Sequence, residues 1–306
     1  MVIANRTEDE RAFREEVFRH LDALAKFYPS GVLTSVEINS FEYRGRQIRL
    51  IVQSGIRKLQ GSEAALTIRT TFTPLSKPPP YVDLTDNDGM IHYKYRGTDP
   101  GHSDNRALRM AMDERLPLAY FIGIGRGLYL PMYPMYILQE IAVQHEFIIG
   151  FSEALSLFNA DSTYKEELQR SYINRITQAR LHQPVFRARV LHAYETSCAI
   201  CRLRHPELLD AAHIIPDGNV RGDPVVPNGL SLCKIHHAAY DNNFVGITPD
   251  GIVDVQERFM KETDGQMLLH GIQKVAGTKI LLPRERAAKP DKDRLAERYE
   301  EFKRAS

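Results

Sequence analysis

The feature that most constrains this chain is a pair of short metal-binding knuckles in its last third. One knuckle is Cys198-Ala-Ile-Cys201 and the other is Cys233-Lys-Ile-His236. Two residues between the ligands let each turn direct both side chains at one ion, which is the spacing of tetrahedral structural zinc sites. The knuckles use all three cysteines of the chain. The sequence therefore predicts one zinc ion bound by Cys198, Cys201, Cys233 and His236.

The cysteines have two alternative roles that stay open at this point. They could be three unrelated buried thiols, or Cys198 and Cys201 could form a redox pair. No thioredoxin-like alternation of strands and helices surrounds them, and an odd number of cysteines is a poor disulfide set. We expect the zinc to stabilise a segment with a thin core of its own, because structural zinc binding contributes folding free energy of the order of 10 kcal/mol.

The segment that joins the knuckles carries a second set of polar residues. It contains LLDAAHIIPDGNVRGDPVVPNGLSLC, and HHAAYD follows within and after the second knuckle. Over residues 196–256 the pattern resembles the HNH, or ββα-metal, nuclease family, in the branch whose first motif is an acidic residue, two small residues and His-Ile. The three HNH positions correspond to His213, Asn228 and His237. The resemblance implies an endonuclease that hydrolyses phosphodiester bonds with a divalent metal ion.

The same resemblance implies a role for each position. His213 takes the place of the general base, and a neutral imidazole can accept a proton near pH 7. Asn228 takes the place of the residue that fixes the loop and orients that base. His237 falls at the start of a predicted helix, with Asp241 four residues on and therefore on the same face. This pair can bind one divalent cation, and its oxygen ligand favours Mg²⁺ or Mn²⁺ over zinc.

The sequence departs from the commonest pattern of the family in two places. Ala212 precedes the base, where many relatives have an Asp or His metal ligand, and the last helix position is Asp241 rather than His. Asp210 would replace the missing ligand if a bulge interrupted the strand predicted over 208–215. His236 and His237 could also exchange roles, although the C-x-x-H spacing favours His236 for zinc.

The chain as a whole predicts an α+β protein with two domains. Its 306 residues are 43% hydrophobic and 26% charged, an ordinary composition for a soluble protein of this size. We expect a β-barrel-like DNA-recognition domain over 1–155 and a helical linker over 156–190, with a break at Gln183-Pro184. The zinc-stabilised ββα-metal nuclease domain then covers 191–306 and ends in a helix over 292–302.

Hydrophobic spacing predicts the elements of the first domain. It favours a helix over 8–27, strands within 32–38, 46–52 and 65–72, a rigid loop at 76–81, a helix over 104–115, and apolar strands within 118–125, 127–138 and 146–152. Between them, residues 90–97 alternate apolar and polar side chains. This alternation predicts a half-buried strand with Ile91, Tyr93 and Tyr95 facing inward and His92 facing outward.

A β-rich domain before a zinc HNH module resembles the layout of modification-dependent restriction endonucleases. In those proteins, SRA- or PUA-type barrels flip a modified base into a pocket, which implies double-stranded DNA with a modified base as the partner. Base pockets need aromatic faces and a few polar groups, and Gly-containing loops let the backbone approach phosphate. The candidate DNA contacts are Tyr93, Tyr95, Arg96, Asp99, Asn105, Arg57 and Arg126. The alternative for each is a half-core or solvated side chain.

The sequence favours a restriction endonuclease over two other functions. A non-cleaving DNA-binding module would not need intact His213, Asn228 and His237, and a mobile-element or toxin nuclease would carry a repeat-like tail or a secretion module. The net charge of +1 gives no argument for nucleic-acid binding. No apolar run spans a membrane and no signal segment begins the chain, so we expect no membrane partner and a cytoplasmic location. Cutting both strands with one site per chain favours a homodimer.

Overall fold

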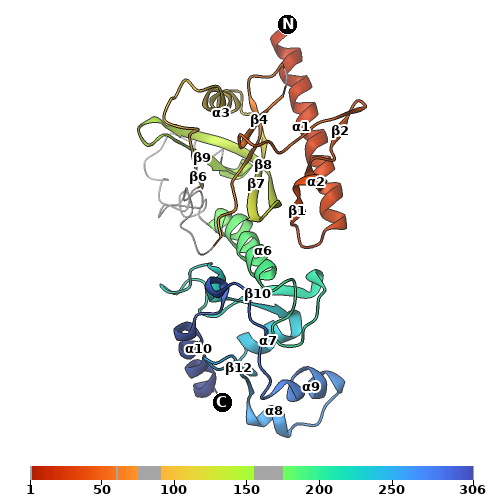
Figure 1. Ribbon diagram of the computed structural model, residues 1–306, viewed down its shortest axis with the longest axis vertical. Coiled ribbons are helices and arrows are strands. Elements are labelled where there is room, and N and C mark those ends of the chain that lie inside the picture. Colours follow the sequence, from red (N-terminus) through yellow and green to blue (C-terminus); the bar gives the residue numbers. More distant parts are fainter. Residues whose placement is uncertain (1, 60, 75–90, 155–174, 306) are drawn as a thin grey trace. The chain divides into compact units, whose positions relative to one another are not determined.

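The computed structural model describes residues 2–59, 61–74, 91–154 and 175–305. These belong to two compact units, residues 1–182 and 183–306 (Figure 1). The loop predicted at 76–81 lies outside the described residues, as does most of the predicted linker, so the predicted domain limits stay predictions. No helix in the described ranges is both long and apolar enough to cross a membrane.

A curled seven-stranded sheet forms the centre of the N-terminal unit (Figure 1). Its strands are β1 Leu33–Thr34, β4 Ile56–Lys58, β5 Ala65–Arg69, β6 Ile91–Lys94, β7 Leu118–Gly125, β8 Leu128–Ile141 and β9 Glu146–Gly150. The order is β4-β5-β7-β8-β9-β6, with β1 on β8, and only the β5–β7 pair is parallel. Irregular register on both sides of β8 lets this 14-residue strand bend through the sheet. Because β4 and β6 end the order, the described sheet is a half-barrel with open edges.

Helices accompany this sheet. Two of them, α1 Val2–Phe27 and α3 Ser103–Asp113, lie where the sequence predicts helices, and a short third one, α2 Ser35–Ile38, lies where it predicts a strand. Phe13 and Leu21 of α1 belong to the same buried cluster as Phe121 of β7. The preceding residue of the strand, Tyr120, instead contacts Tyr93, because successive strand residues point to opposite faces. The predicted strands within 118–125, 127–138 and 146–152 are confirmed.

Two local predictions in this unit are wrong. The strand predicted over 32–38 stops after β1, because Thr34 and Glu37 form a capping box that begins α2: the Glu37 backbone N–H donates to Thr34 Oγ1 (3.2 Å) and the Thr34 N–H donates to Glu37 Oε2 (2.6 Å). His92 of β6 is buried instead of facing outward. Its Nδ1 lies 2.7 Å from Glu146 Oε1, and a paired polar group can be buried without a large cost.

The strand predicted over 46–52 is also much shorter than expected. Only β3, Arg46–Gln47, forms there, and it pairs with β2, Glu42–Tyr43, in a separate small hairpin. Residues 49–53 after it run as irregular chain across the unit. Their backbone is held by Asn39, whose Oδ1 accepts the N–H groups of Leu50 (2.8 Å) and Ile51 (2.9 Å).

The C-terminal unit contains a ββα motif flanked by further helices (Figure 1). Its elements are α6 Gln183–Ala193, β10 Leu209–His213, β11 Gly229–Cys233, α7 Lys234–Asp241, β12 Val245–Ile247, β13 Val253–Val255, α8 Glu257–Lys261, α9 Gln266–Gly271 and α10 Lys292–Ala305. A π-helical turn, Gln178–His182, continues directly into α6, so the predicted break at Gln183-Pro184 is wrong: the helix widens there and does not end. The π turn accommodates Pro184, which has no N–H to donate to the preceding turn.

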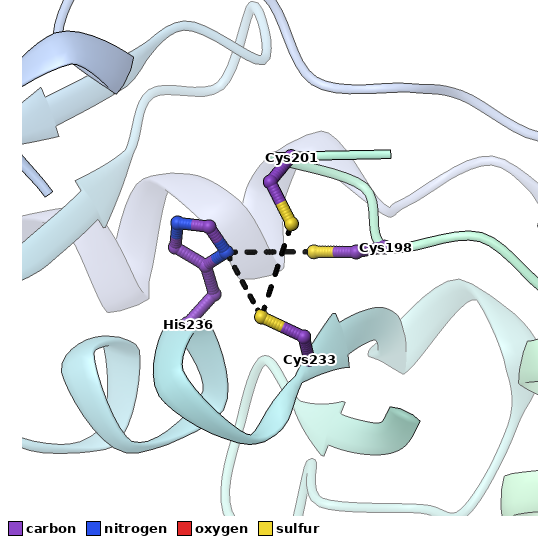
Figure 2. A group of neighbouring side chains, drawn as sticks. All are labelled: Cys198, Cys201, Cys233 and His236. Atoms are coloured by element: carbon purple, nitrogen blue, oxygen red, sulfur yellow. Dashed lines mark hydrogen bonds between the residues drawn. The ribbon is translucent and has the colours of Figure 1, made fainter. Parts of the chain in front are cut away.

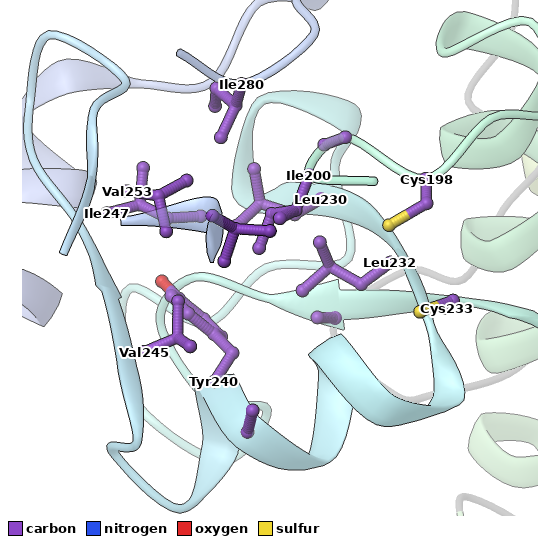
Figure 3. Packing of buried hydrophobic residues seen from close by; sticks show 14 of the residues in the cluster. Cys198, Ile200, Leu230, Leu232, Cys233, Tyr240, Val245, Ile247, Val253 and Ile280 are labelled. Atoms are coloured by element: carbon purple, nitrogen blue, oxygen red, sulfur yellow. The ribbon is translucent and has the colours of Figure 1, made fainter. Parts of the chain in front are cut away.

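The prediction of a thin core around the zinc knuckles is wrong. One buried cluster joins α6, the ββα motif, the β12–β13 hairpin and Ile280 (Figure 3). Cys198 and Cys233 are themselves members of this cluster. The knuckles therefore lie at the border of a substantial apolar core, which the sequence did not indicate because its members are spread over residues 186–295.

Candidate zinc and nuclease centre

The two knuckles bring their four side chains together as predicted (Figure 2). Sγ of Cys198 lies 3.6 Å from Nδ1 of His236, Sγ of Cys233 lies 3.2 Å from the same nitrogen, and Sγ of Cys201 lies 3.9 Å from Sγ of Cys233. Tetrahedral zinc separates its sulfur and nitrogen ligands by roughly 3.5 Å. The group Cys198, Cys201, Cys233 and His236 can therefore bind a zinc ion.

A hydrogen bond fixes the ring of His236 for this role. Its Nε2 lies 2.7 Å from the backbone oxygen of Gly271, to which it donates. The other nitrogen, Nδ1, is the one that faces the thiols. Metal-bound histidines commonly have such a partner on the second nitrogen, because it sets the tautomer and the ring orientation. Of the two adjacent histidines, His236 is thus the one directed at the cysteines.

The predicted general base, His213, lies at the end of β10 beneath an aromatic ring. The ring of Phe186, from α6, stacks on the imidazole with centroids 4.2 Å apart and planes 20° apart. Within the described residues, the buried Nε2 of His213 has no hydrogen-bond partner. Burial lowers the pKa of His213 below its ordinary value of 6.5, with a further lowering by His237 and an opposite effect of Asp217. The imidazole is therefore neutral at pH 7 and able to accept a proton.

A glycine makes this stacking arrangement possible. Gly229 of β11 pairs with His213 across the two-stranded sheet. A Cβ atom on Gly229 would lie 2.4 Å from Cγ2 of Val190 and 2.9 Å from Cζ of Phe186. The missing side chain thus lets α6 approach the strands closely enough to cover the base.

Asn228 holds the chain that follows the base. It is fully buried, and its Nδ2 donates to the backbone oxygens of Ile215 (3.0 Å) and Asp223 (3.1 Å). Its Oδ1 accepts the N–H of Ile215 (2.9 Å), and its backbone oxygen accepts the N–H of Ile214 (2.9 Å). The side chain therefore closes the loop between β10 and β11 and fixes the two residues directly after His213.

His237 is positioned between two carboxylates. Its Nδ1 lies 3.5 Å from Oδ2 of Asp210, and its Nε2 lies 3.2 Å from Oδ2 of Asp241, one helical turn further along α7. The helix begins at Lys234, earlier than predicted, and keeps His237 and Asp241 on one face. The pairing of β10 with β11 is regular, without the bulge that a ligand role of Asp210 would require. The two distances show that Asp210 and Asp241 face opposite nitrogens of the His237 imidazole.

Two cations also surround Asp210. Lys234 Nζ lies 2.6 Å from Oδ2, and Arg187 Nε lies 3.7 Å from Oδ1. Partial burial raises the pKa of the Asp210 carboxyl, but Lys234 and then His237 lower it more, and the net shift is downward. Asp210 is therefore ionised at neutral pH and turns a negative charge toward Nδ1 of His237. Of the described residues, only the zinc-knuckle group brings three or more metal-ligating side chains together.

Most predicted DNA contacts of the N-terminal unit have structural partners. Tyr93 and Tyr95 are buried. The Tyr93 hydroxyl lies 3.3 Å from the Arg69 backbone oxygen, and the Tyr95 hydroxyl bonds the carboxylate of Glu140, which also binds Arg109. Both rings thus act as core residues of the described conformation, and their DNA-binding role stays a prediction.

The other predicted contacts divide into anchored and exposed side chains. The buried Asn105 receives the backbone N–H of Arg96 (2.8 Å) and donates to the backbone oxygen of Asp99 (2.8 Å), so it shapes the turn between β6 and α3. Arg96 pairs with Asp104 at 3.0 Å. Arg57 donates to a backbone oxygen, and Arg126 is exposed in the tight turn between β7 and β8. Their roles toward DNA also stay predictions.

Several residues that surround the histidines could not be identified from spacing. Phe186 and Arg187 lie in a helix more than twenty residues before His213, and Lys234 occupies a spacer position between the ligands of the second knuckle. Spacing within a motif identifies its own ligands, whereas these contacts depend on how α6 packs. Only the apolar pattern of QPVFRARVL indicates that one side of this helix faces a core.

Comparison with known proteins agrees with this geometry. The HNH endonuclease family matches residues 198–248. No curated protein sequence matches the chain. Among solved structures, the chain is similar to the "Modification dependent TagI restriction endonuclease", with a TM-score of 0.27, 17% sequence identity, and coverage of 80% of this chain and 84% of that one. The family match by itself shows that the C-terminal unit contains an HNH endonuclease domain, and the chain is therefore a nuclease.

Proposed function

We propose that the chain is a restriction-type DNA endonuclease, in which the C-terminal unit cuts and the N-terminal unit recognises a modified base. The observation that supports cutting is the environment of His213. A neutral, half-buried imidazole lies in the same small motif as the His237–Asp241 pair, and a zinc-binding group lies at the other end of α7. A general base must be unprotonated at the working pH, and the lowered pKa keeps His213 in that form near neutral pH.

We propose the following division of work among the residues. His213 accepts the proton of the attacking water, and Asn228 keeps the chain after His213 in place. His237 and Asp241 hold a divalent cation, for which two protein ligands are enough, since Mg²⁺ usually keeps several waters and substrate oxygens. Bound Mg²⁺ or Mn²⁺ would neutralise charge on the scissile phosphate and the leaving oxygen. Asp210, predicted as a ligand, better suits the orientation of His237 through Nδ1.

The proposal for the N-terminal unit is supported by the separation of this unit from the nuclease residues. It has its own sheet, its own core and none of the HNH residues. A nuclease in a cell must spare the host genome, and an HNH motif by itself offers no device for discrimination. A curled half-barrel of the SRA or PUA type would supply it by holding a flipped, modified base, because one methyl contact discriminates by about 1–3 kcal/mol.

Digestion of one plasmid prepared in five forms tests this proposal. The forms are unmodified DNA and DNA carrying 5-methylcytosine, 5-hydroxymethylcytosine, N6-methyladenine or phosphorothioate. Each is incubated with the full chain, with Mg²⁺ added or omitted; omission is preferable to EDTA, which would also remove structural zinc. We expect Mg²⁺-dependent cutting of at least one modified form and little cutting of unmodified DNA. Binding without cutting of any form would instead indicate a non-cleaving DNA-binding module.

A further inference from the structure

The N-terminal unit contains a cleft that none of the predicted DNA contacts lines. Its volume is about 530 Å³, within the range of small-molecule sites. The lining comes from α2, from the irregular chain 49–53, and from strands β5 and β8. Its polar residues are Ser35, Asn39, Arg49, Gln53, Arg69 and Tyr129, beside the aliphatic side chains at positions 51 and 52. A volume of this size exceeds that of one nucleotide and is far below that of a duplex segment.

One of the lining side chains, Arg69, has a guanidinium that hydrogen bonds hold in a fixed position. Arg69 donates from Nε to the backbone oxygen of Val52 (2.8 Å), from Nη2 to that of Gln53 (3.1 Å), and from Nη1 to the hydroxyl of Tyr129 (3.0 Å). All three acceptors are neutral, so these bonds orient the positive charge without cancelling it. A fixed cation of this kind attracts an anion more effectively than a mobile one, because little side-chain entropy is lost on binding.

The charge of the cleft is positive and unbalanced. Arg49 and Arg69 both line it, neither forms an ion pair with any residue in the described ranges, and no lining residue is acidic. The free polar groups are mostly donors: the Arg49 guanidinium is exposed, and the Oδ1 of Asn39 is already used by two backbone N–H groups, which leaves its amide nitrogen. A donor-rich, acid-free cleft selects an anionic ligand.

We propose that this cleft binds a single nucleotide through its phosphate, and that the nucleotide is one unit of the bound DNA strand. Arg49 contacts the phosphate at the mouth, while Tyr129, Gln53 and Asn39 surround the sugar and base. The assignment rests on the proposed function, since a nucleotide can enter such a cleft only when it leaves the base stack. It also assigns recognition to α2 and the 49–53 chain, and not to the buried rings of Tyr93 and Tyr95.

Two variants of the full chain test the assignment. Arg49→Gln removes the exposed charge at the cleft, and Arg46→Gln removes a similarly exposed charge on β3, outside the lining. Binding to the plasmid-derived duplex that is cut best is measured by fluorescence anisotropy without Mg²⁺. We expect Arg49→Gln to weaken binding about tenfold and Arg46→Gln to weaken it by less than about threefold. An equal loss in both variants would mean a general charge effect and would overturn the assignment.

Calorimetric titration with deoxynucleoside 5′-monophosphates and with the matching nucleosides shows whether the cleft binds phosphate. Together with the duplex measurement, it distinguishes a nucleotide of DNA from a free nucleotide. We expect the monophosphates to bind the wild-type chain, the nucleosides to bind far more weakly, and Arg49→Gln to remove the difference. Monophosphate binding with unchanged duplex affinity in Arg49→Gln would overturn the assignment to DNA in favour of a free nucleotide. Because neither titration requires cutting, the binding result can be interpreted even if the chain does not cut DNA. Absence of monophosphate binding would refute the phosphate site.

Discussion

At the scale of single residues, the proposed chemistry depends on the apolar cover of His213. The stacked ring of Phe186 excludes water from one face of the imidazole and accounts for the downward pKa shift. A base with a pKa below 6.5 stays unprotonated throughout the neutral range. The rate of cleavage should therefore fall only at acidic pH, when the pH drops through the pKa of the folded protein.

Replacement of Phe186 with Leu should move this acid limit upward. Leu fills part of the space but covers the imidazole less completely, so the pKa of His213 returns toward 6.5 and its basic form is lost at a higher pH. The measurement is single-turnover cleavage between about pH 5 and pH 8, with Val190→Ala as the control for loss of packing on the same helix. An unchanged acid limit in Phe186→Leu, with a normal melting temperature, would show that the ring does not set the pKa.

Asn228→Ala should lose both stability and activity. The substitution removes the donor to the backbone oxygens of Ile215 and Asp223 and the acceptor for the Ile215 N–H. This loss corresponds to about 2–3 kcal/mol of unfolding free energy. Asn228→Asp is the matched comparison, because it keeps the acceptor for Ile215 but turns a buried carboxylate oxygen toward two backbone oxygens. We expect thermal unfolding and cleavage to rank wild type above both variants, with Asp no better than Ala. Full activity of Asn228→Ala would contradict the role given to this side chain.

The residues of the centre divide into those that spacing predicts and those that packing adds. The order of motifs identifies His213, Asn228 and His237, and the C-x-x-H interval identifies His236, because each of these motifs fits within one short supersecondary unit. The motif also identifies Asp210, but it does not predict that this carboxylate faces Nδ1 of His237. Spacing along a chain cannot tell which nitrogen of a ring a carboxylate will face.

At the scale of elements, the zinc group joins the end of β11 and the first turn of α7 to the chain that follows α6. Cys198→Ser should release the metal and lower the melting temperature by an amount on the order of 10 °C, because the binding free energy of the site contributes to folding. Elemental analysis should find one zinc per wild-type chain. The substantial core around the knuckles predicts weakened folding rather than its complete loss.

His236→Cys is the matched control for this variant. It keeps four ligands, so zinc should be retained, while the hydrogen bond to Gly271 is lost. We expect its melting temperature to lie between those of wild type and Cys198→Ser. Wild-type protein purified without chelators and found to contain no zinc would rule out the site.

Long elements were easier to predict than short ones. The helix at 8–27 and the strands at 118–125 and 146–152 have enough apolar residues for the period to be clear. The run at 32–38 is rich in β-branched residues, yet it becomes a helix because two side chains cap it. Burial of His92 was likewise decided by Glu146, a residue far along the chain that hydrophobic periodicity does not take into account.

At the scale of the whole molecule, the proposal divides recognition and cutting between the two units. A chain of residues 183–306 keeps the zinc group, the HNH residues and their buried cluster. If it folds alone, as circular dichroism would show, it should cut modified and unmodified plasmid at equal rates. A preference for modified DNA in this shorter chain would place recognition in the nuclease unit instead.

The most direct test of the central claim is single-turnover plasmid cleavage by wild type and His213→Ala, both with one zinc per chain and both in Mg²⁺. A general base contributes about 10²–10⁴-fold to a rate and little to folding or DNA affinity. We therefore expect wild type to cut in the presence of Mg²⁺, and His213→Ala to cut slower by that factor while it binds DNA and unfolds like wild type. Equal cleavage rates for the two chains would contradict the assignment of His213 as the base.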